Sequence, residues 1–176
     1  MITNLELPGL RQPRWCLANK GSDDPAARAD GNTGRSADQN LQRTVALLAE
    51  DNRADVFLVR EAIAAYSLPI DIYAVPDGEQ ALKFIEASLN DPSAPRPGLL
   101  ILDLNLPKRT GKEVLEFFRK IDAYKDVPVV IITSSELPRE RTELVSLGAT
   151  RFFTKPAGYD QFLRLGEILA DIIPKT

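Results

Sequence analysis

Histidine is absent from this chain of 176 residues, and cysteine occurs once, at Cys16. Without histidine there can be no Ser-His-Asp or Cys-His catalysis, no metalloprotease of the HExxH type and no histidine proton shuttle. A single cysteine forms neither an intramolecular disulfide nor a zinc site built from cysteines. These two absences exclude several large classes of enzyme and of disulfide-stabilised domain.

A strong basic excess and a long apolar run are also missing. The chain carries 22 Lys and Arg against 25 Asp and Glu, a formal net charge of −3, which argues against a general nucleic-acid binder. No apolar run approaches the roughly 18 residues that a membrane-spanning helix needs, and the first residues lack the pattern of a secretory signal. We therefore expect a cytoplasmic protein that binds neither nucleic acid nor membrane.

The composition changes near residue 43. Residues 17–43 contain no aromatic residue and no Val or Ile, so this stretch cannot bury enough apolar surface to offset the entropy of ordering. We expect residues 1–43 to form a flexible N-terminal extension, with a docking arm around Trp15 as the alternative. Residues 44–173 are then the folded domain, and residues 174–176 a C-terminal tail.

Downstream of residue 43, five short apolar runs alternate with five segments of helical spacing. Repeats of this kind are typical of right-handed βαβ crossovers. They predict an α/β fold, a doubly wound five-stranded parallel sheet in the flavodoxin-like order 2-1-3-4-5 with helices on both faces. The expected strands are 44–49, 70–75, 99–102, 127–132 and 151–154, and the expected helices are 55–66, 78–89, 112–121, 139–147 and 159–173.

Polar residues follow four of the five expected strands. In an open parallel sheet, ligands bind beyond the carboxyl ends of the strands, where the strand order reverses. Any one of these acids alone is better explained as the start of a loop or as a helix cap, but the whole set favours a site. Its members are Glu50, Asp51, Asp103, Thr133 and Lys155.

Three clustered carboxylates repel one another unless a cation joins them. Oxygen ligands with few neutral donors suit Mg²⁺, which keeps several waters and commonly bridges to phosphate. Lys155 is no metal ligand while it is protonated, but its ammonium can pair with a carboxylate or a phosphoryl oxygen. The residues themselves therefore predict a magnesium site concerned with phosphate.

Four motifs carry a resemblance to a known family. They are Glu-Asp-Asn at 50–52, Leu-Asp-Leu-Asn-Leu-Pro at 102–107 with Gly111 after it, Ile-Thr-Ser at 132–134 and Phe-Thr-Lys-Pro at 153–156. With this set, the chain resembles the receiver domain of two-component response regulators over roughly residues 43–173. It looks most like the stand-alone regulators that are paired with bacterial phytochromes.

The resemblance implies a role for each acid of the set. Asp103 would accept a phosphoryl group from a phosphohistidine on a partner sensor histidine kinase, giving a 4-aspartylphosphate. Glu50 and Asp51 would bind Mg²⁺ together with Asp103 and the backbone carbonyl of Asn105. We also expect Gly111 to shape the loop after Asp103 as the residue suited to a positive φ.

The resemblance also implies a switch. Thr133 and Lys155 would each bind a phosphoryl oxygen, and Phe152 has the position of the switch aromatic that moves inward with Thr133. Because Phe152 and Phe153 point to opposite faces of a strand, we favour a switch or interface role for Phe152 over a core role. The Lys155–Pro156 bond is expected to be cis, as in the family.

The function implied is that of a single-domain regulator in a phosphorelay, without an attached output domain. It would not be an enzyme in the ordinary sense, although it would assist its own phosphorylation and dephosphorylation. Its partners would be the kinase and a downstream protein that the sequence does not identify. A homodimer through residues 139–147, 151–154 and 159–173 is a further possibility.

Three other functions stay open at this point. A Mg²⁺-dependent phosphohydrolase on the same sheet would want an aspartate two positions after the nucleophile, where this chain has Asn105. A nucleotide or flavin binder would want a glycine-rich loop after the first strand, where this chain has Glu50-Asp51-Asn52-Arg53. A receiver that binds partners but is never phosphorylated is the third.

Overall fold

The structure is a computed structural model that describes residues 43–134 and 138–173. The expected N-terminal extension, apart from Arg43, and the expected tail at 174–176 lie outside the described residues. The boundary at residue 43 therefore stays a prediction. None of the described helices is long and apolar enough to cross a membrane.

The centre of the fold is a sheet of five parallel strands in the order β2-β1-β3-β4-β5. The strand order and the parallel pairing confirm the predicted fold class. The strands are β1 (Thr44–Ala49), β2 (Ile70–Val75), β3 (Leu99–Asp103), β4 (Val129–Thr133) and β5 (Arg151–Thr154). The fourth strand begins two residues later than expected, because Pro128 has no N–H to give to the ladder.

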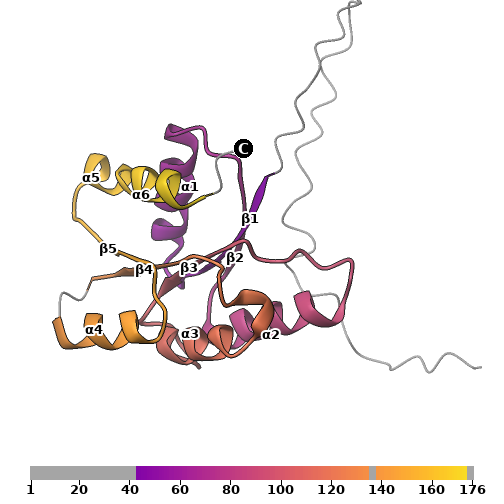
Figure 1. Cartoon of the computed structure of the whole chain (residues 1–176). Helices are drawn as coiled ribbons and strands as arrows, with labels where there is room; N and C mark the ends of the chain where they lie inside the picture. Colours follow the sequence, from indigo (N-terminus) through magenta and orange to yellow (C-terminus); the bar gives the residue numbers. More distant parts are fainter. Residues whose placement is uncertain (1–42, 135–137, 174–176) are drawn as a thin grey trace, which may run out of the picture. The chain divides into compact units, whose positions relative to one another are not determined.

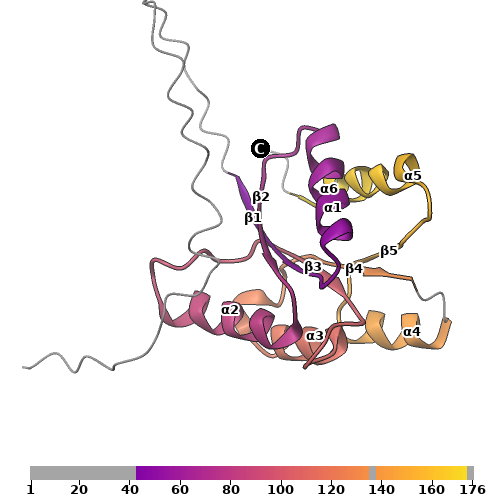
Figure 2. The same ribbon diagram turned by 180° about the vertical axis from the view of Figure 1, so that it is seen from behind.

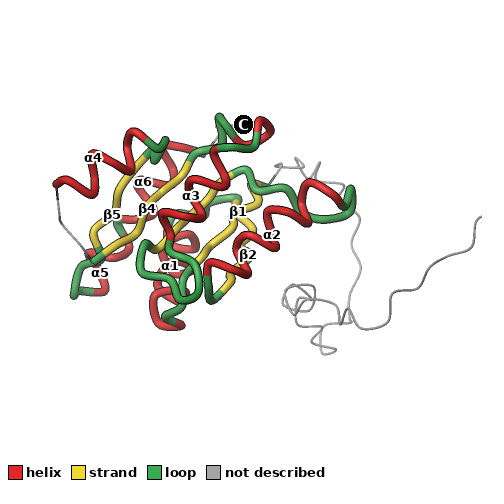
Figure 3. Tube along the Cα trace, turned by 90° about the horizontal axis from the view of Figure 1, so that it is seen from below, coloured by secondary structure: helices red, strands yellow, loops and turns green. Residues whose placement is uncertain are grey.

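Helices cover both faces of this sheet. Figures 1 and 2 show α1, α5 and α6 on one face and α2, α3 and α4 on the other. In Figure 3 the sheet is seen from below, with β2 and β5 at its two edges. The helices are α1 (Arg53–Ala65), α2 (Gly78–Asn90), α3 (Gly111–Arg119), α4 (Pro138–Ser146), α5 (Tyr159–Leu163) and α6 (Leu165–Ile172), with a short 3-10 turn η2 (Asp122–Tyr124) after α3.

The expected final helix, 159–173, is not continuous. It breaks at Arg164, whose N–H donates to the carbonyl of Gln161, and the N–H of Glu167 then donates to the carbonyl of Arg164. Both bonds span three residues, so the chain tightens locally into a 3-10 turn and α6 starts afresh. The prediction of one helix is therefore wrong in this detail, because apolar periodicity does not distinguish the two hydrogen-bond patterns.

The central strands are completely buried. Leu99–Leu102 of β3 and the apolar residues of β4 have no exposed surface, as expected of parallel strands covered on both sides. Of the five buried polar residues in the described part of the chain, four lie at the carboxyl edge of this core: Glu50, Asp77, Asp103 and Thr133. Burial of polar groups is costly unless they are paired, so this edge is where a functional site is to be sought.

Candidate functional site: an acidic pocket at the carboxyl edge of the sheet

The register of the strands brings the expected site residues to one edge. Ala49 of β1 pairs with Leu102 of β3, so Glu50 and Asp103 follow directly from paired positions. Asp103 in turn pairs with Ile132 of β4, which places Thr133 one residue further along the neighbouring strand.

The last member of the set arrives from β5. Thr154 pairs with Thr133, and the N–H of Lys155 donates to the carbonyl of Thr133 at 2.9 Å. Lys155 therefore leaves β5 beside the end of β4, and its side chain turns into the pocket.

The ammonium of Lys155 donates to three carboxylates. Its Nζ lies 2.6 Å from Oδ2 of Asp103, 2.8 Å from Oε2 of Glu50 and 2.9 Å from Oδ2 of Asp55. The Lys155 side chain is only 14% exposed. A lysine has three N–H donors, so all of them are engaged inside the pocket.

Asp103 is fixed at both of its oxygens. Oδ1 accepts the backbone N–H of Asn105 at 2.9 Å, and Oδ2 accepts Lys155. The carboxylate is therefore held in one orientation at the end of β3, with 5% of the residue exposed.

Three acids form a group that can hold a metal ion. Glu50, Asp51 and Asp103 each offer one carboxylate oxygen, and these oxygens lie within 4.8 Å of one another. Glu50 and Asp103 are buried, whereas Asp51 is exposed and opens the group to solvent. An all-oxygen, anionic donor set of this kind fits a hard divalent cation such as Mg²⁺.

The charges of the pocket shift the pKa values of its members. Burial raises the pKa of Glu50 to about 7, although the bond from Lys155 acts in the opposite direction. Burial alone would lower the pKa of Lys155, but its bonds to Asp103, Glu50 and Asp55 outweigh that effect and raise it. These three carboxylates share the single ammonium of Lys155, so the pocket is suited to take up further positive charge.

The loop between β3 and α3 is fastened at two points. Lys108 has a left-handed backbone, with φ of 66°, and its Nζ donates to Oδ2 of Asp77 at 2.7 Å. Asp77 is buried and caps the start of α2. The N–H of Gly111 donates to the carbonyl of Leu104 at 3.0 Å. The loop that presents Asn105 is therefore held against both α2 and β3.

The positive φ expected at Gly111 is found at Lys108 instead. Gly111 is needed for a different reason, which is space: a side chain there would overlap the carbonyl oxygen of Asp103 and lie 2.8 Å from Cα of Leu104. The expected residue matters, but the expected conformation is wrong.

The two phenylalanines of β5 separate as the alternation predicts. Phe153 is buried and packs edge-on against Phe162, with ring centroids 5.2 Å apart. Phe152 is only partly buried, and the guanidinium of Arg141 lies 4.7 Å from its ring centroid. Phe152 is therefore not a core residue and remains accessible beside α4.

Two findings differ from what the sequence suggests. The described residues contain no cis peptide bond, so Lys155–Pro156 is trans. This is the isomer that an Xaa-Pro bond favours unless its surroundings impose the other. Asp55, in contrast, was missed as a site residue. Its position in the first turn of α1 was the available signal, because a helix that starts at a strand end brings its first turn to the same edge.

The family comparison covers most of the described chain. The family model described as the response regulator receiver domain matches residues 46–165. Response regulator Rcp1 of Synechocystis sp. (strain ATCC 27184 / PCC 6803 / Kazusa) is 36% identical over 99 residues, which cover 56% of this chain and 67% of that relative.

Solved structures agree with this match. The phosphorylated cyanobacterial phytochrome response regulator RcpA aligns with a TM-score of 0.66 and 31% identity, over 73% of this chain and 92% of that one. The Mn²⁺-bound form of response regulator Rcp1 aligns with a TM-score of 0.67 and 29% identity, over 76% of this chain and 97% of that one. The structural similarity thus extends over about three quarters of the chain.

Proposed function

The chain belongs to the response regulator receiver domain family of two-component signalling, and we propose that Asp103 is its phosphoryl acceptor. One observation carries this proposal. Asp103 is a buried carboxylate at the end of β3, with Lys155 2.6 Å from Oδ2 and with the acids Glu50 and Asp51 beside it. The donor would be a phosphohistidine on a partner histidine kinase, which agrees with the lack of histidine in this chain.

The transfer replaces one bond to phosphorus by another. An oxygen of Asp103 attacks the phosphorus atom, an O–P bond forms, and the P–N bond breaks with its electron pair going to the imidazole nitrogen. The side chains around Asp103 contribute by position and charge. Lys155 would move its N–H from Asp103 to a phosphoryl oxygen, and the hydroxyl of Thr133 would donate to another.

The receiver family binds Mg²⁺ or Mn²⁺ at its acidic site, and the residues of this pocket suit such an ion. Glu50, Asp51 and Asp103 would bind it through carboxylate oxygens, together with the backbone carbonyl of Asn105. A divalent cation there supplies the positive charge that brings an anionic phosphoryl group to an anionic nucleophile.

The phosphoryl group would then act as a switch. It adds roughly −1.5 to −2 of charge at neutral pH, which creates hydrogen bonds to Thr133 and Lys155 that the unmodified pocket lacks. Movement of Thr133 at the end of β4 would change the packing beside Phe152, whose partly buried ring lies under the guanidinium of Arg141 in the present state. The signal would leave the pocket along β4 and β5.

The relatives support a proposal for the partners. Because RcpA is a phytochrome response regulator, we extend the proposal to a phytochrome-type kinase as the donor and to a separate downstream protein as the reader. A homodimer through α4, β5 and the final helices is supported by the edge position of β5 and the exposed Val145 on α4. Analytical ultracentrifugation tests it, and a monomer at every concentration, with and without phosphorylation, contradicts it.

Labelling by a small donor tests the function itself. With acetyl phosphate and Mg²⁺, we expect the protein to gain the mass of one phosphoryl group, and we expect Asp103→Asn to gain none, because an amide oxygen is a poor nucleophile and carries no charge. Intact-protein mass spectrometry measures both. Labelling that persists in Asp103→Asn would contradict the proposal, and continuous turnover of unrelated phosphate esters would favour a phosphohydrolase.

The metal is tested by thermal unfolding. Mg²⁺ binds the folded pocket and not the unfolded chain, so millimolar Mg²⁺ should raise the Tm of the wild type. Asp51→Asn removes one ligand at the exposed side of the group and should show a much smaller rise. An equal rise in both proteins would remove Asp51 from the metal site.

A further inference from the structure

Lys155 has one partner that the proposed function does not use. Asp55 lies in the first turn of α1, whose N-cap is Asn52, and not at the end of a strand. Its Oδ2 accepts Lys155 at 2.9 Å, and its side chain is 17% exposed against 14% for Lys155. The contact is thus largely shielded from solvent, where an ion pair is screened less than at the surface.

Asp55 also differs from the other two partners of Lys155. Glu50 and Asp103 belong to the group of acids whose oxygens lie within 4.8 Å of one another, and Asp55 does not. A cation bound by that group would partly neutralise the negative charges of Glu50 and Asp103. Both carboxylates would then interact less strongly with the ammonium of Lys155. The charge of Asp55 would remain for Lys155 alone.

We propose that Asp55 is a positioning residue that keeps the ammonium of Lys155 at the pocket while Asp103 and Glu50 engage the metal and the phosphoryl group. The inference rests on the proposed function and adds a residue to it. Lys155 reaches the pocket from β5 on a long flexible stem. With Asp55 as a fixed partner on α1, Lys155 exchanges one acceptor, Asp103, for a phosphoryl oxygen and does not have to be recaptured from solvent.

A simpler explanation of Asp55 is that it stabilises the start of its own helix, α1. An acid in the first turn of a helix interacts favourably with the helix dipole, and that would account for its presence without any role at Lys155. The two explanations differ in one respect. The helical role is independent of Lys155, whereas the positioning role disappears when Lys155 is removed.

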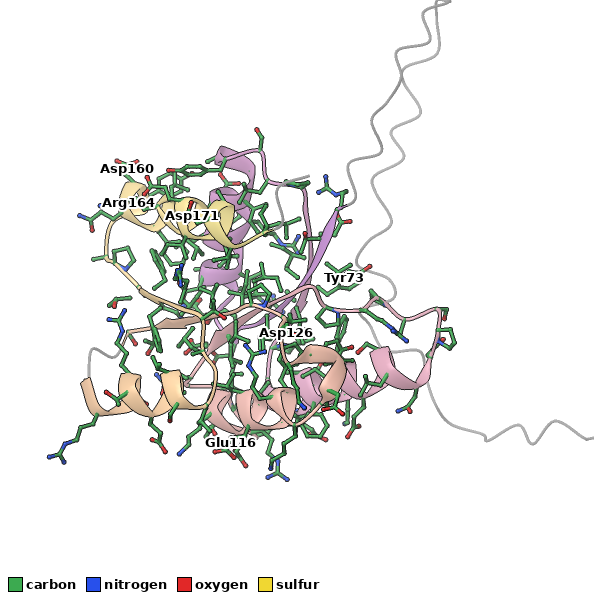
Figure 4. All side chains as sticks on the ribbon, in the orientation of Figure 1. Tyr73, Glu116, Asp126, Asp160, Arg164 and Asp171 are labelled. Atoms are coloured by element: carbon green, nitrogen blue, oxygen red, sulfur yellow. The ribbon has the colours of Figure 1, made fainter. Side chains whose placement is uncertain are left out.

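The test is a double-mutant cycle on the rate of labelling by acetyl phosphate in saturating Mg²⁺. Asp55→Asn should lower the rate constant about tenfold, which corresponds to the loss of one charge-assisted hydrogen bond. Asp55→Glu retains the charge and should recover part of the rate. Asp171→Asn, an exposed change of the same type on α6 (Figure 4), is the control and should leave the rate within about twofold.

The second arm uses the Lys155→Ala background. In that background, Asp55→Asn should change the remaining labelling rate by less than about twofold. The effects of two residues in contact are coupled, and the interaction between Asp55 and Lys155 is already lost when Lys155 is removed. An equal loss in both backgrounds, or no loss in the wild-type background, overturns the inference. Neither result touches the proposed function, which fails only if the wild type is not labelled or Asp103→Asn still is.

Discussion

Replacing Lys155 by alanine is expected to slow phosphorylation of Asp103 about a hundredfold, the scale seen when one preorganised donor to a developing negative charge is lost. Lys155 is the one cation bonded to Asp103 among the described residues, at 2.6 Å, and it is largely buried. The rate of mass gain with acetyl phosphate, in saturating Mg²⁺, measures the effect.

The same substitution should destabilise the metal-free protein by about 3 kcal/mol, because removal of one partner leaves buried charges uncompensated. Glu50 and Asp103 are 2% and 5% exposed, and both would lose their ammonium. Mg²⁺ should therefore raise the Tm of Lys155→Ala more than that of the wild type. Lys83→Ala is the matched control, since Lys83 pairs with Glu79 at the exposed surface of α2 and such pairs contribute little.

A normal labelling rate in Lys155→Ala would mean that the ammonium has no part in transfer. An unchanged Tm in the absence of metal would mean that the carboxylate of Glu50 is neutralised by a proton instead. Protonation of Glu50 is accessible to measurement because the pKa of its carboxyl group is about 7. Repeating the unfolding experiment at a pH well above 7, where Glu50 is ionised, shows whether its protonation had hidden the loss of the Lys155 ammonium.

The sequence predicts the pocket because its residues are tied to strand ends. An unbroken apolar run such as Leu99–Leu102 is typical of a central strand of this fold, and the residue that follows such a strand emerges at the carboxyl edge. The same reasoning places Glu50, Thr133 and Lys155. Their meeting depends on the strand order and on the register, which brings the ends of β1, β3, β4 and β5 to one edge.

Features set by contacts across the chain could not be predicted in this way. The bond from Lys155 to Asp55 depends on how α1 is placed against β5, and apolar periodicity does not give that. The left-handed backbone at Lys108 depends on its bond to the buried Asp77, which offsets the cost of a conformation that a lysine rarely adopts. The break at Arg164 is likewise invisible to apolar periodicity, whereas the trans bond before Pro156 is simply the isomer that an Xaa-Pro bond favours.

Gly111→Ala is the second change for which we expect a large effect. The sequence singles out this glycine, and the structure supplies the reason, which is the lack of space for a side chain. The glycine begins α3 with its N–H bonded to the carbonyl of Leu104. A methyl group there would overlap the backbone of Asp103 and Leu104. Backbone atoms cannot rotate aside as a side chain can, so α3 must move away from β3, at a cost of about 3 kcal/mol.

The expected result is a loss of stability and of the site together. The carbonyl that the new methyl group would displace belongs to Asp103 itself, so the carboxylate and the loop bearing Asn105 should shift with it. Mg²⁺ should then raise the Tm of Gly111→Ala less than that of the wild type. Urea unfolding, with and without Mg²⁺, measures both effects.

Gly158→Ala provides the matched control for Gly111→Ala. A methyl group at Gly158 would come no nearer than 3.6 Å to Gln161, and the position is the N-cap of α5, so the cost should not exceed about 1 kcal/mol. If Gly111→Ala were as mild as this control, or lost stability while binding Mg²⁺ normally, the close contact between α3 and β3 would not be what positions Asp103. The orientation of the acceptor would then have to come from the bonds to Asn105 and Lys155 alone.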